Sequence, residues 1–248
     1  MFKASSVPEL IQKLPTTSNG FSPFRLDVHK HLAFGVIPAR RKYELHMERY
    51  NSAARILTPL LGGGKLQILD IGCGEGFMKF FLGDLPADWF GIEIWKDRAE
   101  YCELLGYKIY QVDLNNSVFP WGDNSFDLVI ASHVFEHLSN LSNALRESGR
   151  VLKPGGLLLI ATPTAPPGIA SLKRSFFAIF KHQLGETQNA FSYLSLRREC
   201  LRILGWGPET IVDIRGFRIF SARKHLSLEN WKWFYNRASC KMNGESCS

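Results

Sequence analysis

The chain has 248 residues, 45 % of them hydrophobic, and carries a formal net charge of +7. That length and composition suit one α/β domain with decorations and a full hydrophobic core, and they exclude a low-complexity or disordered chain. No apolar run approaches the ~20 residues of a membrane span, and residues 1–4 do not begin a secretory signal.

The positive charge is concentrated outside the middle of the chain. Residues 63–162 carry more acidic than basic side chains, whereas residues 1–62 and 163–248 are both basic. Basic clusters in these flanks either meet an anionic substrate or form solvated helix faces. The five cysteines are scattered and lack metal-ligand spacing, so we expect reduced thiols in a cytoplasmic protein and no metal site.

The first predicted elements precede the sheet. Prolines recur in residues 1–41 with little periodicity, which predicts an N-terminal extension of loops and short helices. Residues 42–57 have apolar side chains near the helical period, and Pro59 is expected to end or kink that helix. Tyr50 lies on the apolar stripe, where it either packs in the core or covers a bound ligand. We place the main domain at residues 42–224.

The most informative stretch of the chain is residues 68–77. A short apolar run ends in Asp70 and is followed at alternate positions by Gly72, Gly74 and Gly76. This pattern is typical of a buried parallel strand that turns sharply into a helix with a ligand resting on the turn. A purely structural turn is the alternative. Phe77 stands where a dinucleotide-binding fingerprint requires glycine, which disfavours an NAD-binding turn.

Two further predicted strands end in acids. The first of these strands is predicted at residues 88–94 and has Glu93 near its carboxyl end. The second is predicted at residues 108–114 and has Asp113 near its carboxyl end. The carboxyl ends of parallel strands meet at one edge of an open sheet, so we expect both carboxylates beside the glycine turn.

The fourth and fifth strands complete the parallel part of the predicted sheet. Residues 120–138 read as a polar turn, a strand and a loop that holds Ser132 and His133. Residues 151–156 close a helix with a Pro-Gly-Gly turn, and residues 157–163 supply the fifth strand. Helices are predicted after the second and fourth strands, at residues 97–105 and 140–152.

An inserted lid is predicted after the fifth strand, at residues 164–190. It opens with a proline-rich loop and continues as a basic amphipathic helix, which either packs on the domain or lies on a membrane surface. Residues 191–206 predict a helix stopped by glycine, and residues 210–214 and 217–222 predict a final pair of strands. Residues 225–248 form an aromatic C-terminal tail.

These elements, taken together, point to a known family. The Asp-x-Gly-x-Gly-x-Gly pattern of residues 70–76 resembles motif I of the class I S-adenosylmethionine-dependent methyltransferases, and the following elements match that family in order over about residues 45–163. The chain is most similar to the group that includes ubiquinone-type and saccharide methyltransferases. The resemblance implies a doubly wound, mostly parallel seven-stranded sheet, with a helical N-terminal cover and a lid inserted after strand five.

The resemblance also implies roles for individual residues, with S-adenosylmethionine as the cofactor. Glu93 would accept hydrogen bonds from the ribose hydroxyls, and Asp113 from the adenine amine, with Leu114 beside the ring. His133 is the candidate general base for an oxygen nucleophile, unless it lines the cofactor only through its backbone. The residues implied to bind the cofactor are Asp70, Gly72, Cys73, Gly74, Glu93, Asp113, Leu114 and Ser132.

The predicted activity is methyl transfer to an oxygen or nitrogen nucleophile of a small molecule, a saccharide or a lipid-linked acceptor. Two alternatives stay open: an RNA methyltransferase that uses the basic flanks, and a non-catalytic module that binds the cofactor. An NAD-dependent oxidoreductase is disfavoured by Phe77. We expect no transmembrane segment and no stable nucleic acid partner, and peripheral membrane contact stays open.

Overall fold

The structure is a computed structural model that describes residues 50, 53–54, 57–58, 61, 64–83, 85–164, 191–206, 210–214 and 217–224. The predicted N-terminal extension at residues 1–41 and the aromatic tail at residues 225–248 lie outside the described residues. The same holds for all of the predicted lid except Thr164. The boundaries of these segments therefore stay predictions.

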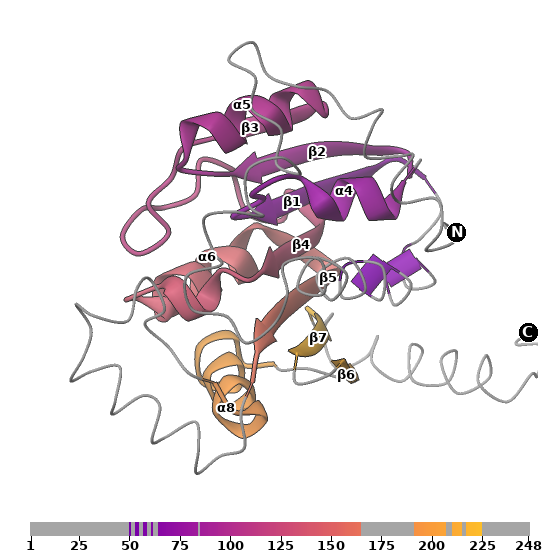
Figure 1. The fold of residues 1–248 in the computed structure, drawn as a ribbon. Coiled ribbons are helices and arrows are strands. Elements are labelled where there is room, and N and C mark those ends of the chain that lie inside the picture. The colour runs from indigo at the N-terminus through magenta and orange to yellow at the C-terminus, as the bar shows by residue number, and fades with distance from the viewer. Residues whose placement is uncertain are drawn as a thin grey trace, which may run out of the picture.

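A single mixed sheet forms the centre of the described domain, in the strand order β3-β2-β1-β4-β5-β7-β6 (Figure 1). Neighbouring strands from β3 to β5 pair in parallel, whereas β7 pairs antiparallel with both β5 and β6. The sheet has seven strands, but parallel pairing covers only five of them. The strands are β1 (Leu66–Ile71), β2 (Ala87–Ile92), β3 (Tyr107–Tyr110), β4 (Phe126–Ser132), β5 (Leu152–Pro163), β6 (Thr210–Ile214) and β7 (Phe217–Arg223).

The strand order reverses direction between β1 and β4. The chain winds outward from β1 through β2 to β3, and then returns to place β4 on the other side of β1. In an open α/β sheet, ligands bind outside the carboxyl ends of the strands at such a switch point. The glycine turn after β1 and the loop after β4 are therefore at the position where the fold predicts a ligand.

The parallel strands are buried on both faces, and alternate residues pack into two separate cores. In β1, Leu66 and Ile68 pack with Met78 and other side chains of one cluster, whereas Leu69 and Ile71 belong to the second. This explains the nearly continuous apolar runs in the sequence, because a strand covered on both faces shows no polar alternation.

The helices cover both faces of the sheet, as Figure 1 shows. Buried side chains of α4 and α5 belong to one core, and those of α6 and α8 belong to the other. Local signals in the sequence set the helix ends: Asn140 caps α6, Ser192 and Ser195 form a capping box at α8, and Gly205 ends α8 with a φ of 76°. The helices are α4 (Phe77–Leu82), α5 (Lys96–Leu104), α6 (Leu141–Val151), α8 (Tyr193–Leu204) and the short 3-10 helix η4 (Phe135–His137).

Two strand boundaries differ from the sequence predictions. The third strand ends at Tyr110 rather than Leu114, because the Asp113 carboxylate and carbonyl accept hydrogen bonds from the following residues and form a turn. The fifth strand begins at Leu152 rather than residue 157. The Pro-Gly-Gly segment lies inside that strand because Gly155 and Gly156 bond to Lys224 of the neighbouring β7 segment.

The predicted N-terminal helix is described at only a few positions. Tyr50, Ala53, Ala54 and Leu57 are helical there, and the last three are buried in the core cluster on the α4 face. A cover over the ligand site stays a prediction.

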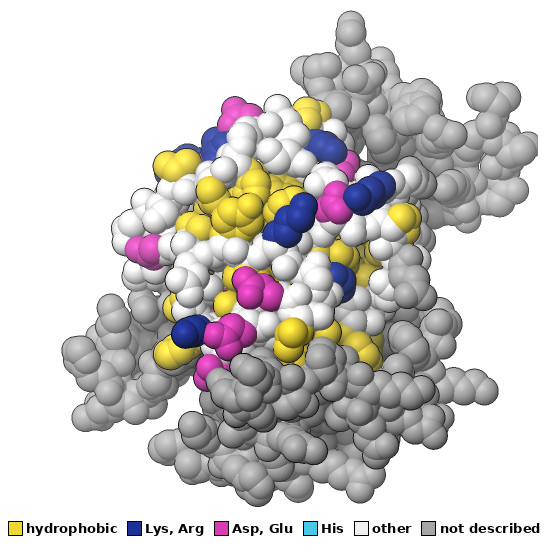
Figure 2. All heavy atoms as spheres, turned by 90° about the horizontal axis from the view of Figure 1, so that it is seen from above, with side chains coloured by type: hydrophobic (Ala, Val, Ile, Leu, Met, Phe, Trp, Pro, Cys, Tyr) yellow, Lys and Arg dark blue, Asp and Glu magenta, His cyan; other side chains and the backbone are white. Residues whose placement is uncertain are grey.

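Figure 2 shows the molecule from above, with hydrophobic side chains gathered near the centre of the face and charged side chains around them. The elements at this end in Figure 1 are α5 and β3. Leu104 of α5 and Tyr110 of β3 are large hydrophobic residues exposed to solvent. The β3 edge of the sheet is therefore only partly covered by the described residues.

Candidate active site

The glycine turn between β1 and α4 is a tightly bonded loop. Gly72, Gly74 and Gly76 all have positive φ, at 61°, 55° and 69°. The amide of Cys73 donates to the carbonyl of Ile92 at the end of β2, and the amide of Gly76 donates to the carbonyl of Cys73. Other residues reach this backbone region only at a cost, so the sequence pattern is explained by the turn geometry itself.

The glycines of the turn have different surroundings. A Cβ at Gly72 would collide with the side chain of Val134, and one at Gly76 would lie 2.6 Å from Leu105 Cδ1. A Cβ at Gly74 would meet only a backbone oxygen at 3.9 Å. Gly72 and Gly76 are thus required by packing inside the protein. Gly74 instead leaves open space against the main chain, which is what the approach of a ligand requires.

Glu93 joins the end of β2 to the glycine turn. Its side chain is 5 % exposed, and its Oε2 accepts a hydrogen bond from the Gly74 amide at 3.0 Å. Its Oε1 accepts from the Trp95 amide at 2.9 Å. Each carboxylate oxygen can accept more than one hydrogen bond, so this fixed side chain still has capacity for ligand hydroxyls.

Asp70 lies beneath the turn, at 2 % exposure. Tyr107 Oη of β3 donates to Asp70 Oδ2 at 3.1 Å. Burial raises the pKa of Asp70 to about 7, and the nearby charge of Glu93 acts in the same direction, against the lowering effect of the Tyr107 hydrogen bond. The structure thus brings Asp70 and Glu93 together, with Asp70 as the deeper of the two.

Asp113 lies three residues beyond β3 and is exposed, with its carboxylate bonded within its own loop. Its Oδ1 accepts from the Asn115 amide at 2.9 Å, and its Oδ2 accepts from Asn116 Nδ2 at 2.8 Å. The Asn116 hydrogen bond is the main cause that lowers the pKa of Asp113. Leu114 beside it is buried. The carboxylate is therefore ionised and held on the surface.

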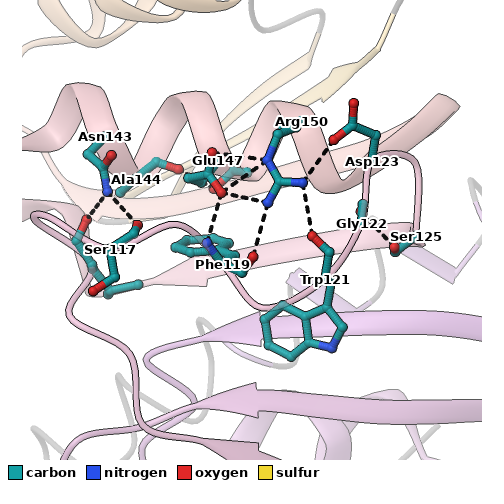
Figure 3. A network of polar contacts seen from close by, with 12 residues as sticks. Ser117, Phe119, Trp121, Gly122, Asp123, Ser125, Asn143, Ala144, Glu147 and Arg150 are labelled. Atoms are coloured by element: carbon teal, nitrogen blue, oxygen red, sulfur yellow. Dashed lines mark hydrogen bonds and ion pairs between the residues drawn. The ribbon is translucent and has the colours of Figure 1, made fainter.

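A second network supports the loop that follows Asp113 (Figure 3). The Arg150 guanidinium of α6 donates to the carbonyls of Phe119 and Trp121 and pairs with Glu147 and Asp123. Glu147 in turn accepts from the Phe119 amide at 2.8 Å. This network fixes the β3–β4 connection on α6.

Cys73 forms a buried contact with Cys102 of α5. The two Sγ atoms lie 3.5 Å apart, and Cys102 also donates to the Gly74 carbonyl at 3.2 Å. The hydrogen bond that the Cys73 thiol donates to Cys102 and its burial raise the pKa of Cys73 well above its ordinary value. Cys73 is therefore a packed thiol of the turn and is unsuited to nucleophilic chemistry.

Tyr50 from the N-terminal segment lies among the polar residues of the site. Its ring packs against Phe77 and Phe81 of α4, and its side chain is hydrogen-bonded to Ser132 at the end of β4. Burial raises the pKa of Tyr50, and so do the negative charges nearby, which belong to Glu75, Asp70 and Glu136. The Tyr50 hydroxyl thus lies near both the glycine turn and the loop after β4.

His133 follows β4 directly and has a φ of 57°, unusual for a residue other than glycine. Its amide donates to the Ala161 carbonyl of β5 at 2.8 Å, and its Nδ1 lies 3.2 Å from Glu136 Oε1. Glu136 Oε2 accepts from Thr162 Oγ1 at 3.0 Å. Sequence reasoning missed Glu136 and Thr162. The spacing of His133 and Glu136 across one turn was the available signal for the first, and no sequence signal marks Thr162.

Comparison with known proteins agrees with this geometry. Residues 69–160 match the family model described as a methyltransferase domain. The chain is 36 % identical over 112 residues to the human mitochondrial ubiquinone biosynthesis O-methyltransferase, covering 42 % of this chain and 30 % of that protein. It is 29 % identical over 121 residues to the Azorhizobium caulinodans ubiquinone biosynthesis O-methyltransferase, covering 47 % of this chain and 46 % of that protein. The matched part thus spans less than half the length of these relatives.

A solved S-adenosylmethionine-dependent methyltransferase from Aquifex aeolicus has the same fold, with a TM-score of 0.51 at 16 % identity, covering 72 % of this chain and 98 % of that one. Residues 69–160 therefore match a methyltransferase domain, and this part of the chain has the fold of the class I S-adenosylmethionine-dependent methyltransferases. Enzymes of this class use S-adenosylmethionine as the methyl donor.

The described residues lack two further features. They contain no group of three or more His, Cys, Asp or Glu side chains arranged to hold a metal ion. None of the helices in this part of the chain has the length and apolar character of a membrane span.

Proposed function

We propose that the protein transfers a methyl group from S-adenosylmethionine to an oxygen nucleophile of a small molecule, with a nitrogen nucleophile, a saccharide or a lipid-linked compound as further acceptor classes. The observation that carries the proposal is the pairing of Gly74 and Glu93. Gly74 offers open space against the main chain, and Glu93 holds the same residue through its amide. The names of the two curated relatives favour oxygen over nitrogen.

The residues proposed to hold the cofactor fit an adenosyl group. Glu93 presents a fixed carboxylate to ribose hydroxyls, while Asp113 and Leu114 lie on the loop beyond the neighbouring strand. Asp70, Gly72 and Cys73 act from beneath, by holding the turn in shape. Ser132, the last residue of β4, borders the site beside Tyr50.

The bound cofactor supplies a methyl group on a positively charged sulfur that is already an activated leaving group. The protein therefore has to align the acceptor, exclude water and take up the proton that an oxygen nucleophile loses. Alignment of this kind contributes ~7–11 kcal/mol in well-oriented systems. His133 is the proposed proton acceptor, because it lies at the carboxyl end of β4 with its ring held by Glu136.

The acceptor is tested with S-adenosylmethionine labelled in its methyl group, incubated with the protein and a fractionated metabolite extract. We expect label in a small-molecule fraction, identified by mass, and no transfer by Glu93→Ala. Label in RNA, with binding that weakens steeply as salt rises, would favour the RNA methyltransferase instead. Cofactor binding without transfer to any fraction would favour the non-catalytic module. A cytoplasmic location is proposed from the cysteine pattern alone.

A further inference from the structure

Glu136 is a buried carboxylate shared by two side chains of the site. It lies in η4 and is 4 % exposed. Its Oε2 accepts from Thr162 Oγ1 at 3.0 Å, and its Oε1 lies 3.2 Å from His133 Nδ1. Thr162 is fully buried in β5. Each carboxylate oxygen thus has its own partner, and the Glu136 side chain is fixed from both sides.

The backbone also fixes the position of the His133 ring. Ser132 pairs with Ala161 across β4 and β5, and the next amide, that of His133, bonds to the Ala161 carbonyl. Thr162 is the residue after Ala161. The same pair of parallel strands therefore fixes the strained φ of His133 and the position of the Thr162 hydroxyl. Residues held in a strained conformation in this way are common at functional sites.

A carboxylate only accepts hydrogen bonds, so its contact with Nδ1 requires the proton of the neutral imidazole to be on Nδ1. Resting on the function proposed above, we propose that Glu136, held by Thr162, is a positioning residue that keeps His133 in this tautomer. Nε2, which is buried in this structure, is then the ring nitrogen that takes up a proton when the acceptor hydroxyl reaches it. The anionic Glu136 also stabilises the positively charged imidazolium formed when it does so.

The acceptor hydroxyl gives its proton to His133 Nε2 while its oxygen forms a bond to the methyl carbon, and the bond between that carbon and the sulfonium sulfur breaks with its electron pair on sulfur. The products are a methyl ether, the neutral thioether of the spent cofactor and protonated His133, which later releases its proton to water.

Nitrogen-15 NMR of the histidine rings tests the tautomer without any substrate. The chain has seven histidines, and comparison with His133→Gln assigns the His133 ring signals. In the wild-type protein at alkaline pH we expect His133 with its proton on Nδ1. Glu136→Gln can donate as well as accept, so we expect a mixture of tautomers. Thr162→Val keeps the shape of the buried side chain but removes the hydrogen bond to Glu136. We expect this variant to show a smaller shift of His133 towards the mixture of tautomers.

The labelled-methyl assay provides the second readout. The rate of transfer to a hydroxyl acceptor should fall by about 100-fold in Glu136→Gln, which is the lower end of the rate enhancement that general base catalysis provides. The affinity of this variant for S-adenosylhomocysteine should change by less than about threefold. A wild-type His133 with its proton on Nε2, or an unchanged tautomer and transfer rate in both variants, would overturn the inference. Absence of transfer by the wild-type protein would instead reject the proposed function, whatever the tautomer.

Discussion

The backbone amide of Gly74 donates a hydrogen bond to Glu93 Oε2, with 3.0 Å between the two atoms. This bond joins the turn after β1 to the end of β2, so the acid and the open glycine share one position at the sheet edge. The site is thus assembled by contacts between neighbouring parallel strands, and changes to either residue should act on the other.

Replacing Gly74 with alanine should separate ligand binding from folding. Both Gly72 and Gly74 have positive φ, so alanine at either position costs ~1–2 kcal/mol in backbone strain. Gly72→Ala also collides with Val134, which adds ~1–3 kcal/mol of overpacking. We expect Gly74→Ala to fold but to bind S-adenosylhomocysteine at least tenfold more weakly, and Gly72→Ala to be clearly less stable.

Urea denaturation and calorimetry of the two variants check this expectation. Gly205→Ala is the matched control, because Gly205 also has a positive φ, 76°, and a Cβ there meets nothing within 4 Å. Equal loss of stability in Gly72→Ala and Gly74→Ala, with ligand affinity retained by the latter, would show that Gly74 does not face the ligand.

The buried Asp70 should make the stability of the ligand-free protein depend on pH. Its pKa rises from about 4 when unfolded to about 7 when folded, so the folded state binds the proton more tightly. The stabilisation from this group is present below pH 4 and is lost as pH rises towards 7 and above, by up to about 4 kcal/mol. Asp70→Asn cannot lose a proton and should remove this dependence.

The check is the free energy of unfolding of wild type and Asp70→Asn at pH 5 and at pH 8. We expect the free energy of unfolding of Asp70→Asn to rise relative to that of the wild type between pH 5 and pH 8. A constant difference across that range would mean that Asp70 is ionised throughout.

Loss of Arg150 should destabilise the fold more than loss of its exposed partner. Arg150→Met leaves Glu147 buried without its cation, which costs ~3–5 kcal/mol for a buried pair. Asp123 is exposed, so Asp123→Asn should cost less than ~1 kcal/mol. Urea denaturation measures both. Similar values for the two variants would mean that the contacts in Figure 3 are energetically equivalent.

The sequence was sufficient to predict the sheet, the glycine turn and the acid after β2, because each depends on local pattern: apolar runs, positive φ and the end of a strand. It was insufficient for Asp113, which forms its own turn with Asn115 and Asn116 instead of extending β3. It also missed the contact between Glu136 and Thr162, which lie 26 residues apart. Such contacts depend on the register of neighbouring strands, and periodicity along one strand carries no information about that register.

Calorimetric titration with S-adenosylhomocysteine tests the central claim most directly, using the wild-type protein, Glu93→Ala and the exposed control Glu103→Ala. We predict a dissociation constant in the micromolar range for the wild type and the control, and no measurable binding for Glu93→Ala in a protein that remains folded. Equal affinity of the wild type and Glu93→Ala would contradict a cofactor site formed by Glu93 and Gly74.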